Sequence, residues 1–291
     1  MKRRAVFFVI LCVMFVIGGA SNKTEEEKFL PQFSSSSKVH PNNFFDPRYF
    51  KPESSQKPIP SNKKILGAVV PHHLLAHRMI ADVFSKMQNA PPNLLILVGP
   101  NHKNLGPKIL VSRLGWQTPF GTVEADMEAV DYLVSYNIAK EDEYVFDGEH
   151  SMGNLMPFIK YYLPNTKVLP IICHYDVSKK ETKKLAENLL SLIQNGAAIV
   201  ASVDFSHYLT ADEAAKMDKE TLKALNDNNW DSIFLMGNDH LDSPASLATL
   251  FFAMENAGIP DFTLVSHTNS GILLGSDIIE TTSYMTFLFQ K

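Results

Sequence analysis

The chain has 291 residues, 45% of them hydrophobic, and a formal net charge of −4 at pH 7. This mildly acidic balance argues against nucleic acid as a partner, because nucleic-acid binding depends on clustered positive charge. Cys12 falls in a predicted leader and leaves Cys173 as the one thiol of the folded part, which excludes a disulfide framework and a cysteine-rich zinc motif. Stability must therefore come from a hydrophobic core, which a chain of this length can supply.

Residues 1–20 have the pattern of a targeting segment. Three basic residues at positions 2–4 precede an uncharged, mostly apolar run from Ala5 to Ala20. The run is shorter than the roughly 20 residues that cross a bilayer comfortably, and it ends in small residues that a signal peptidase accepts. We expect either a signal peptide cleaved after Ala20 or a retained N-terminal membrane anchor. In both cases the protein would be exported, extracytoplasmic or membrane-anchored, with membrane contact only through this segment.

Residues 21–63 are polar, irregular and rich in proline and serine. This composition is typical of a linker or loosely packed arm. Several aromatic residues, including Phe44, Phe45, Tyr49 and Phe50, instead favour docking of part of the arm on the body of the protein. Both interpretations remain open at this stage.

Residues 64–291 contain short apolar runs separated by amphipathic stretches, a pattern typical of a sheet covered by helices. The predicted strands are Ile65–Val70, Leu94–Val98, Ile109–Ser112, Val168–Ile172, Ala197–Val203, Thr263–His267 and Tyr284–Phe289. The predicted helices lie near 76–89, 126–137, 150–162, 179–194, 211–226 and 244–257, with Ser178, Thr210 and Ser243 as N-caps. We therefore expect a single α/β domain with a mainly parallel or mixed central sheet flanked by helices.

Three histidines follow directly after predicted strands. His72 follows the first strand, His102 follows the second, and His207 follows the fifth. Because the carboxyl ends of strands in an open α/β sheet line one crevice, these side chains should converge there. Neutral imidazole binds divalent transition metals, so the pattern predicts a divalent metal site. Asp204 is placed either to orient His207 or to serve as a ligand.

Other polar residues have alternative explanations. Each strand-end histidine could instead be a hydrogen-bonded loop residue, and His73 and His77 are weaker candidates for the site. His150, in the run Gly148-Glu149-His150-Ser151, is either a member of the site or a capping element at a helix start. Cys173 is expected to be a buried thiol. The histidines expected to be structural or exposed are His40, His174, His240 and His267.

Six segments resemble, in order, motifs of the Memo-like family, which includes the AmmeMemoRadiSam system protein B, and more distantly those of the class III extradiol dioxygenases. They are Val69-Val70-Pro71-His72, Leu97-Val98-Gly99-Pro100-Asn101-His102, Trp116-Gln117-Thr118-Pro119-Phe120-Gly121, Asp147-Gly148-Glu149-His150-Ser151, Ser202-Val203-Asp204-Phe205-Ser206-His207 and Thr268-Asn269-Ser270-Gly271. The resemblance covers essentially residues 65–290.

The resemblance implies that His72 and His102 are the two metal-binding histidines. It also implies that His207 carries protons, oriented by Asp204, and that His150 assists from the pocket wall. The third ligand is a cysteine in the best-known Memo branch and a glutamate in the dioxygenases, and neither has a counterpart in the run from Asn269 to Leu273. We therefore expect His150, His207 or Asp204 to complete the ligand set.

Three functions fit these residues. The first is an iron(II)-dependent oxidoreductase of extradiol-dioxygenase type, with two histidines and a carboxylate on the metal. The second is a non-catalytic protein that binds a peptide or small ligand on the same fold. The third is a zinc-dependent hydrolase in which His207 or Glu149 is the base. Iron(II) is the favoured metal and zinc the alternative, and whether the chain is an enzyme is left open.

Overall fold

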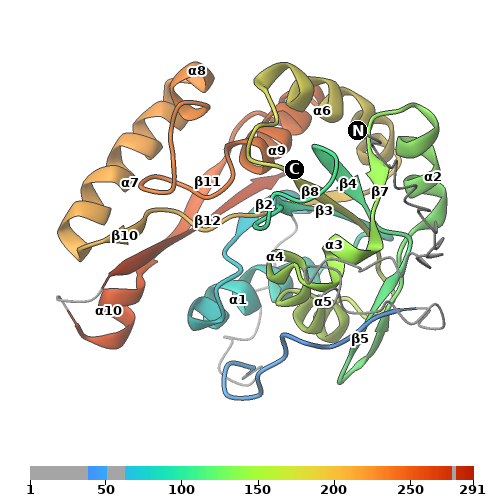
Figure 1. The fold of residues 1–291 in the computed structure, drawn as a ribbon, viewed down its shortest axis with the longest axis horizontal. Helices are drawn as coiled ribbons and strands as arrows, with labels where there is room; N and C mark the ends of the chain where they lie inside the picture. Colours follow the sequence, from blue (N-terminus) through green and yellow to red (C-terminus); the bar gives the residue numbers. More distant parts are fainter. Residues whose placement is uncertain (1–38, 51–62, 277–279) are drawn as a thin grey trace, which may run out of the picture. The chain divides into compact units, whose positions relative to one another are not determined.

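The computed structural model describes residues 39–50, 63–276 and 280–291. Within them the central feature is a nine-stranded mixed sheet with strand order β10-β12-β2-β9-β3-β8-β4-β7, in which β11 pairs with β12 (Figure 1). Its strands are β2 (Ile65–Val70), β3 (Leu94–Pro100), β4 (Ile109–Val111), β7 (Lys140–Glu141), β8 (Lys167–Cys173), β9 (Ala198–Ser202), β10 (His207–Leu209), β11 (Thr263–Asn269) and β12 (Thr281–Gln290).

The middle of this sheet is parallel. Strands β2, β9, β3 and β8 are parallel neighbours, whereas β12 runs antiparallel to β2 and β4 antiparallel to β8. The central strands are apolar and almost fully buried, as expected for strands covered on both faces. Since they are parallel, their carboxyl ends lie at one edge of the sheet, and the segments that leave them start there.

Helices cover both faces. One hydrophobic core joins the sheet to α2 (Met127–Ser135), α6 (Lys179–Gln194) and α9 (Pro244–Asn256), with α8 (Trp230–Ile233) at its margin. A second core joins the other face to α1 (His77–Met87), α3 (Glu143–Asp147), α4 (His150–Gly153) and α5 (Met156–Tyr162). The remaining helices are η3 (Leu74–Ala76), α7 (Ala211–Asn226) and α10 (Ser270–Leu274). Each sheet face thus buries an apolar layer, which is the main stabilising contribution to such a fold.

Helix starts follow local sequence rules. Ser178 and Thr210 both form capping boxes with a glutamate three residues later, and Ser243 caps α9 ahead of Pro244. These three N-caps confirm the sequence prediction. The cap at Ser243 also matters for the site described below, because it holds the preceding residue, Asp242, at the start of α9.

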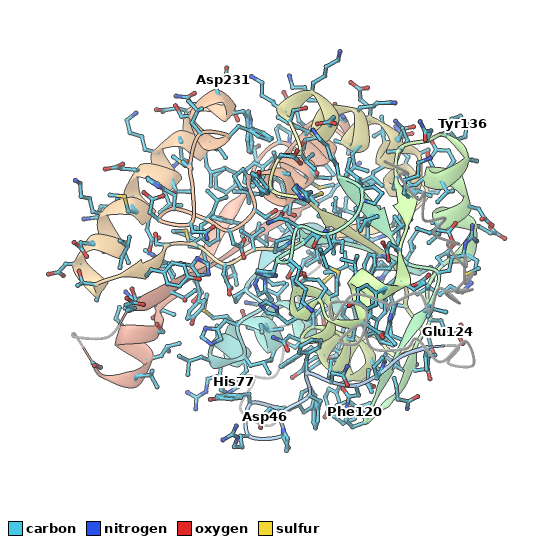
Figure 2. The ribbon with its side chains drawn as sticks, in the orientation of Figure 1. Asp46, His77, Phe120, Glu124, Tyr136 and Asp231 are labelled. Atoms are coloured by element: carbon cyan, nitrogen blue, oxygen red, sulfur yellow. The ribbon has the colours of Figure 1, made fainter. Side chains whose placement is uncertain are left out.

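The segment 39–50 docks on the body of the protein. Its strand β1 (Val39–His40) pairs in parallel with β5 (Gly115–Thr118), which forms a hairpin with β6 (Gly121–Val123). Phe50 stacks near Phe120 and Phe158, with ring centroids 4.6 and 5.0 Å apart. Asp46 and Phe120 mark this region in Figure 2. The docking expected from the aromatic residues therefore occurs in the described part of the arm.

The predicted fold class is confirmed, and the differences are local. All seven predicted strands are present, six of them with shifted ends, but the helix predicted over 150–162 is divided into α4 and α5. The sequence analysis did not identify the hairpin β5–β6 or the short strands β1, β7 and β10. Each of these has four residues or fewer, which is too short to show a reliable alternation of apolar and polar side chains.

The predicted exported, extracytoplasmic or membrane-anchored location is wrong. In the residues described, no helix combines the length and apolar character needed to cross a membrane. The longest helices, α6 and α7, have 16 residues each and carry many charged side chains. The predicted signal peptide or anchor at 1–20 and most of the predicted linker at 21–63 lie outside the described residues.

Candidate metal centre

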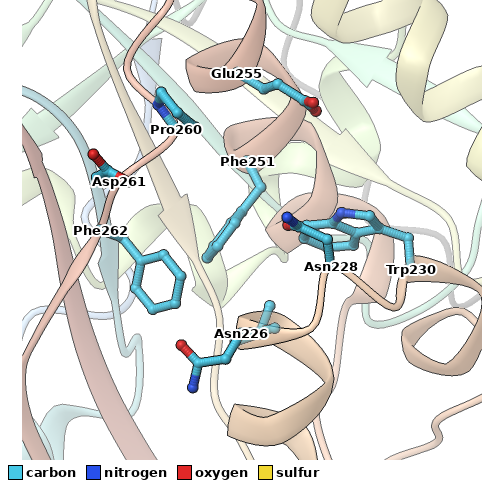
Figure 3. Close-up of a pocket in the computed structure, with 9 residues that line it drawn as sticks. Asn226, Asn228, Trp230, Phe251, Glu255, Pro260, Asp261 and Phe262 are labelled. Carbon is cyan, nitrogen blue, oxygen red and sulfur yellow. The ribbon is translucent and has the colours of Figure 1, made fainter.

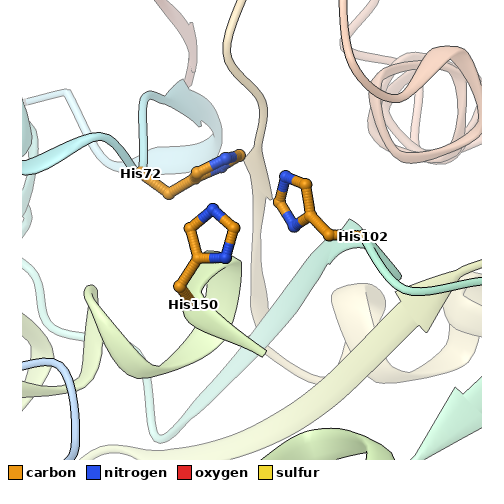
Figure 4. A group of neighbouring side chains, drawn as sticks. All are labelled: His72, His102 and His150. Carbon is orange, nitrogen blue, oxygen red and sulfur yellow. The ribbon is translucent and has the colours of Figure 1, made fainter. Parts of the chain in front are cut away.

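Three histidines from separate segments face one another at the carboxyl edge of the parallel strands (Figure 4). His72 follows β2, His102 follows β3, and His150 begins α4. The ring centroids of His72 and His102 are 5.1 Å apart, and those of His102 and His150 are 4.0 Å apart. Parallel strands therefore bring His72 and His102 together as the sequence predicted, and α4 adds His150.

The hydrogen bonds of His72 define which ring nitrogen is free. Its Nδ1 lies 3.1 Å from the Ser202 hydroxyl oxygen, and that hydroxyl donates its proton to the carbonyl oxygen of Ser151 at 2.8 Å. Ser202 must therefore accept from Nδ1–H, which leaves the Nε2 lone pair of His72 available to a metal. Burial lowers the pKa of His72 well below its ordinary value, and nearby His102 and His150 add to this, so the ring is neutral.

His102 is oriented by Glu149 in the same way. Its Nδ1 donates to Glu149 Oε1 at 2.7 Å, and its backbone amide donates to Oε2 at 2.9 Å. Burial opposes ionisation of Glu149, but the hydrogen bonds from His102 and from the backbone of Ser151 outweigh it and lower the pKa to about 2. The buried carboxylate fixes the tautomer and leaves His102 Nε2 free. The His102 side chain keeps 29% exposure, so the site is accessible.

Two aspartates complete the centre. Asp204 follows β9 and accepts a hydrogen bond from the backbone amide of His72 at 3.1 Å. Asp242 is held beside it, because an isolated bridge joins Phe205 to Leu241 and the amide of Asp242 donates to the Asp204 carbonyl oxygen at 3.1 Å. The two carboxylates thus lie next to each other with side chains only 4% and 6% exposed.

Potential ligand atoms of His72, Asp204 and Asp242 lie close together, and His102 lies near Asp242. His72 Nε2 lies 3.3 Å from Asp242 Oδ2 and 3.5 Å from Asp204 Oδ2, and His102 Nε2 lies 3.9 Å from Asp242 Oδ2. Ligands about 2.1 Å from one ion are roughly 3.0–3.4 Å apart. The spacings of His72 Nε2 from the two carboxylates are therefore close to those of a coordination shell, whereas the spacing of His102 Nε2 from Asp242 Oδ2 is longer.

The electrostatics of the two aspartates suit a bound cation. Burial and the neighbouring Asp204 raise the pKa of Asp242 well above its ordinary value, and burial also raises the pKa of Asp204. Asp242 Oδ1 is buried and has no hydrogen-bond partner among the described residues. Since a buried, unpaired carboxylate is costly, a divalent ion fits these residues. The donor groups His72, His102, His150 and His72, Asp204, Asp242 could each hold such an ion.

His207 lies at the edge of this centre rather than within it. It lines a small cavity of about 140 Å³ together with His102 and Asp242, but its ring belongs to neither donor group. Its Nδ1 is buried without a hydrogen-bond partner, and burial lowers its pKa against the attraction of Asp204. Among the described residues no hydrogen bond joins Asp204 to the His207 ring. Asp204 instead binds the backbone of His72.

The other histidines are engaged elsewhere. His73 bonds the Tyr284 hydroxyl at 2.5 Å, and His77 lies in the first turn of α1 with its Nδ1 near the Leu74 carbonyl. His40, His174, His240 and His267 bond neighbouring carboxylates or a backbone oxygen away from the centre. Cys173 is buried as expected, and burial raises the pKa of its thiol to about 12.

Asp242 is the functional candidate that the sequence analysis missed. The family resemblance places the third ligand in the run from Asn269 to Leu273. In the structure Asn269 is the N-cap of α10, and the rest of the run lies within this helix. Asp242 follows no regular strand, so the rule of polar residues at strand ends did not apply to it. The available signal was an acidic residue directly before a helix start, in Leu241-Asp242-Ser243-Pro244.

A larger cavity lies elsewhere in the protein. It measures about 410 Å³ and is lined by residues of α7, α9 and the segments after them, including Trp230, Phe251 and Phe262 (Figure 3). None of the histidines lines it. The metal-ligand chemistry is therefore concentrated at the smaller cavity beside His102 and Asp242.

The sequence is similar to those of known proteins. A protein of Aquifex aeolicus described as a MEMO1 family protein is 31% identical over 250 residues, covering 82% of this chain and 89% of the relative. A MEMO1 family protein of Pyrobaculum aerophilum is 28% identical over 236 residues, covering 78% and 84% of the two chains.

One solved structure has a similar fold. The uncharacterized protein JW3007 of Escherichia coli K12 has a TM-score of 0.53 at 10% identity, with 76% of this chain and 99% of that chain covered. At this identity the likeness concerns the fold alone. The model of the family described as Memo-like protein matches residues 42–287, which include every residue of the candidate centre. The chain therefore belongs to the Memo-like family.

Proposed function

We propose that this protein is a metal-dependent oxidoreductase that acts on a small chelating substrate, such as an aromatic 1,2-diol, with dioxygen. The observation that supports the proposal most directly is the position of Asp242 Oδ2, 3.3 Å from His72 Nε2 and 3.9 Å from His102 Nε2. Two imidazoles and one carboxylate on a face with open positions are the ligand set of non-haem iron(II) oxygenases. Iron(II) is therefore the favoured metal, and zinc is the alternative.

Bound iron(II) would supply the redox chemistry with dioxygen that no side chain of this protein can provide. The protein's own residues have separate tasks. Ser202 and Glu149 hold the two imidazoles in the tautomer that presents Nε2. His207 lines the cavity and burial lowers its pKa, so its imidazole is suited to take a proton from a substrate hydroxyl.

His150 and Asp204 have roles that depend on how the site is filled. His150 stacks on His102 and is 40% exposed on its side chain, so it can contact a ligand or serve as an alternative donor. Asp204 faces His72 Nε2 and also holds the backbone of His72. We assign Asp204 to positioning and charge balance, and His150 to the wall of the substrate site.

The alternative functions have weaker support. In a zinc hydrolase Glu149 would have to accept a proton from water, but both of its oxygens already accept hydrogen bonds from His102 and Ser151. This leaves His207 as the base of such an enzyme. A non-catalytic binding protein would retain the fold, but it would gain nothing from keeping Asp242 buried beside Asp204 at a cost in free energy.

The test uses the full chain, because residues 39–50 dock on the domain. The protein would be loaded with iron(II) without oxygen, analysed for metal, and assayed for oxygen uptake with catechol. We expect one ion per chain, lost in His72→Ala and Asp242→Ala, and oxygen uptake that depends on the ion. His174→Ala is the matched control, since His174 also follows a strand, β8, but belongs to neither donor group.

The outcomes separate the parts of the proposal. Metal content that is unchanged in His72→Ala and Asp242→Ala would reject the ligand assignment. Stoichiometric metal without oxygen uptake would reject the oxidoreductase activity and favour zinc chemistry or ligand binding at the same centre.

A further inference from the structure

Tyr208 has an unusual backbone conformation. Four non-glycine residues in the described parts of the chain have a positive φ, and three of them are asparagines at positions 104, 137 and 228. The fourth is Tyr208, with φ 61°. Asparagine adopts this left-handed conformation readily, whereas a bulky side chain there costs free energy. Such a residue persists only where the surrounding structure enforces it, and it is often functional.

The surrounding structure is a β-bulge. Tyr208 is the middle residue of β10, and the pairing of β10 with β12 shifts register between His207 and Leu209. A bulge of this kind redirects a side chain, and bulges are frequent beside active sites. Tyr208 lies within the shift, and 68% of the residue is exposed.

Tyr208 lies beside the candidate centre. Tyr208 lines the cavity of about 140 Å³ together with His102, His207 and Asp242. Tyr175 lines the same cavity and is 76% exposed. Its position is fixed by Asn104, whose side-chain oxygen accepts a hydrogen bond from the Tyr175 amide at 2.9 Å. Two exposed tyrosines thus flank the cavity that adjoins the proposed ligands.

Tyr208 has little structural use in its present position. Its hydroxyl has no hydrogen-bond partner within the described residues, and its one ring neighbour is His207, 5.7 Å away between centroids. An exposed ring held in a costly conformation gains nothing for the fold. The cost is explained if the ring contacts a ligand.

We propose that Tyr208, together with Tyr175, forms an aromatic surface at the cavity mouth that contacts the ring of a planar aromatic ligand bound at the centre. Tyr208 is then a specificity residue that favours aromatic over aliphatic chelating ligands, and this inference rests on the metal site of the proposed function. Offset or edge-to-face contact between rings provides the preference. Asn238 also lines the cavity and is exposed, so its side-chain amide can bond a hydroxyl group on such a ring.

The test compares two chelating probes on the zinc-loaded full chain, in which no turnover occurs. One probe is 4-nitrocatechol, which is aromatic, and the other is acetohydroxamic acid, which is aliphatic. Tyr208→Asn removes the ring with a residue that tolerates the left-handed conformation, and Tyr208→Phe keeps the ring. Tyr136→Asn is the matched control, because Tyr136 is 63% exposed on the surface (Figure 2), has a negative φ and is not part of the cavity.

We expect Tyr208→Asn to weaken 4-nitrocatechol binding about three- to tenfold, the range that a ring contact provides. Acetohydroxamic acid binding should stay within about twofold, and Tyr208→Phe should bind both probes like the unchanged protein. The thermal midpoint of Tyr208→Asn should not fall, because the substitution relieves backbone strain. Tyr136→Asn should change neither probe.

Three results would overturn the inference. Equal weakening of both probes would indicate a general disturbance of the site, and no weakening of either would show that the ring makes no ligand contact. A fall in the thermal midpoint with unchanged binding would show a structural role. These results concern Tyr208 alone as long as both probes bind the zinc-loaded protein and not the His72→Ala variant. Failure of both probes to bind would instead reject the metal site itself.

Discussion

Two histidines of this protein, His40 and His72, are both almost fully buried among carboxylates, and their surroundings differ in how completely the polar atoms are paired. His40 bonds Asp147 through Nδ1 at 2.8 Å, and its Nε2 lies 2.7 Å from the Ser112 hydroxyl and 3.1 Å from Glu143. Its carboxylate partners keep contact with solvent, with side chains 32% and 25% exposed. Burial opposes ionisation of Glu143, but hydrogen bonds from His40 and Ser112 outweigh it and lower its pKa.

At His72 the balance is reversed. The facing carboxylates, Asp204 and Asp242, are almost inaccessible to solvent, and burial raises the pKa of both. The Nε2 of His72 offers a lone pair rather than a proton, and Asp242 Oδ1 has no partner. The same residue types thus form a satisfied structural contact in one place and an unsatisfied ligand set in the other. The two regions differ in whether their buried polar atoms have hydrogen-bond partners, and not in the number of histidines.

The largest expected difference between the two regions is in metal binding. Asp242→Asn keeps the shape of the side chain but removes its charge, so the affinity for zinc should fall by at least about a hundredfold. A competition titration against a chromophoric chelator would measure this. In the metal-free protein the same change removes the cost of burying an ionisable carboxyl group beside Asp204, so the thermal midpoint should rise rather than fall.

Asp231→Asn serves as the control for charge, because its side chain is 84% exposed. This variant should leave both affinity and thermal midpoint unchanged within error. If Asp242→Asn retained full affinity, the distinction drawn between the His40 and His72 regions would fail, since the unsatisfied carboxylate would then have no ligand role.

The opposite behaviour is expected at His40. The imidazole packs on Trp116 with ring centroids 4.3 Å apart and joins β1 to the acidic side chains of α3. His40→Ala should therefore lower the free energy of unfolding by about 2–4 kcal/mol, from lost packing and lost charge-assisted hydrogen bonds. Denaturant unfolding would measure it. Zinc affinity of the folded variant should not change, and a parallel loss of affinity would show that the two regions are coupled.

Much of the fold could be predicted from the sequence. Fully apolar runs such as Leu94–Val98 identify buried strands, and Ser178, Thr210 and Ser243 mark helix starts. These signals are local, since they depend on residues within one element. The parallel arrangement of the central strands then follows from the helices between them, and it is sufficient to bring His72 and His102 together.

The parts that could not be predicted depend on long-range contacts. Asp242 enters the centre through a bridge between Phe205 and Leu241, which no local pattern indicates. The docking of His40 depends on β1 pairing with β5, a strand of four residues that was not predicted. The conformation of Tyr208 arises from a bulge against β12. In each case the tertiary structure, rather than the propensity of the segment, determines the position of the side chain.

The smallest expected effect on zinc affinity comes from substituting Glu149. Glu149 and Glu143 both accept hydrogen bonds from histidines, but only Glu149 lies at the metal centre. Glu149→Gln keeps an oxygen for His102 Nδ1 but loses the charge that also holds the backbone amides of His102 and Ser151. Zinc affinity should fall about 10- to 100-fold, as for other groups that orient a ligand without touching the metal.

Glu143→Gln is the matched control, because Glu143 accepts hydrogen bonds from the Ser112 hydroxyl and the Arg113 amide beside His40. It should lower stability and leave affinity unchanged. Equal loss of affinity in both variants would mean that general destabilisation, rather than orientation of His102, controls metal binding.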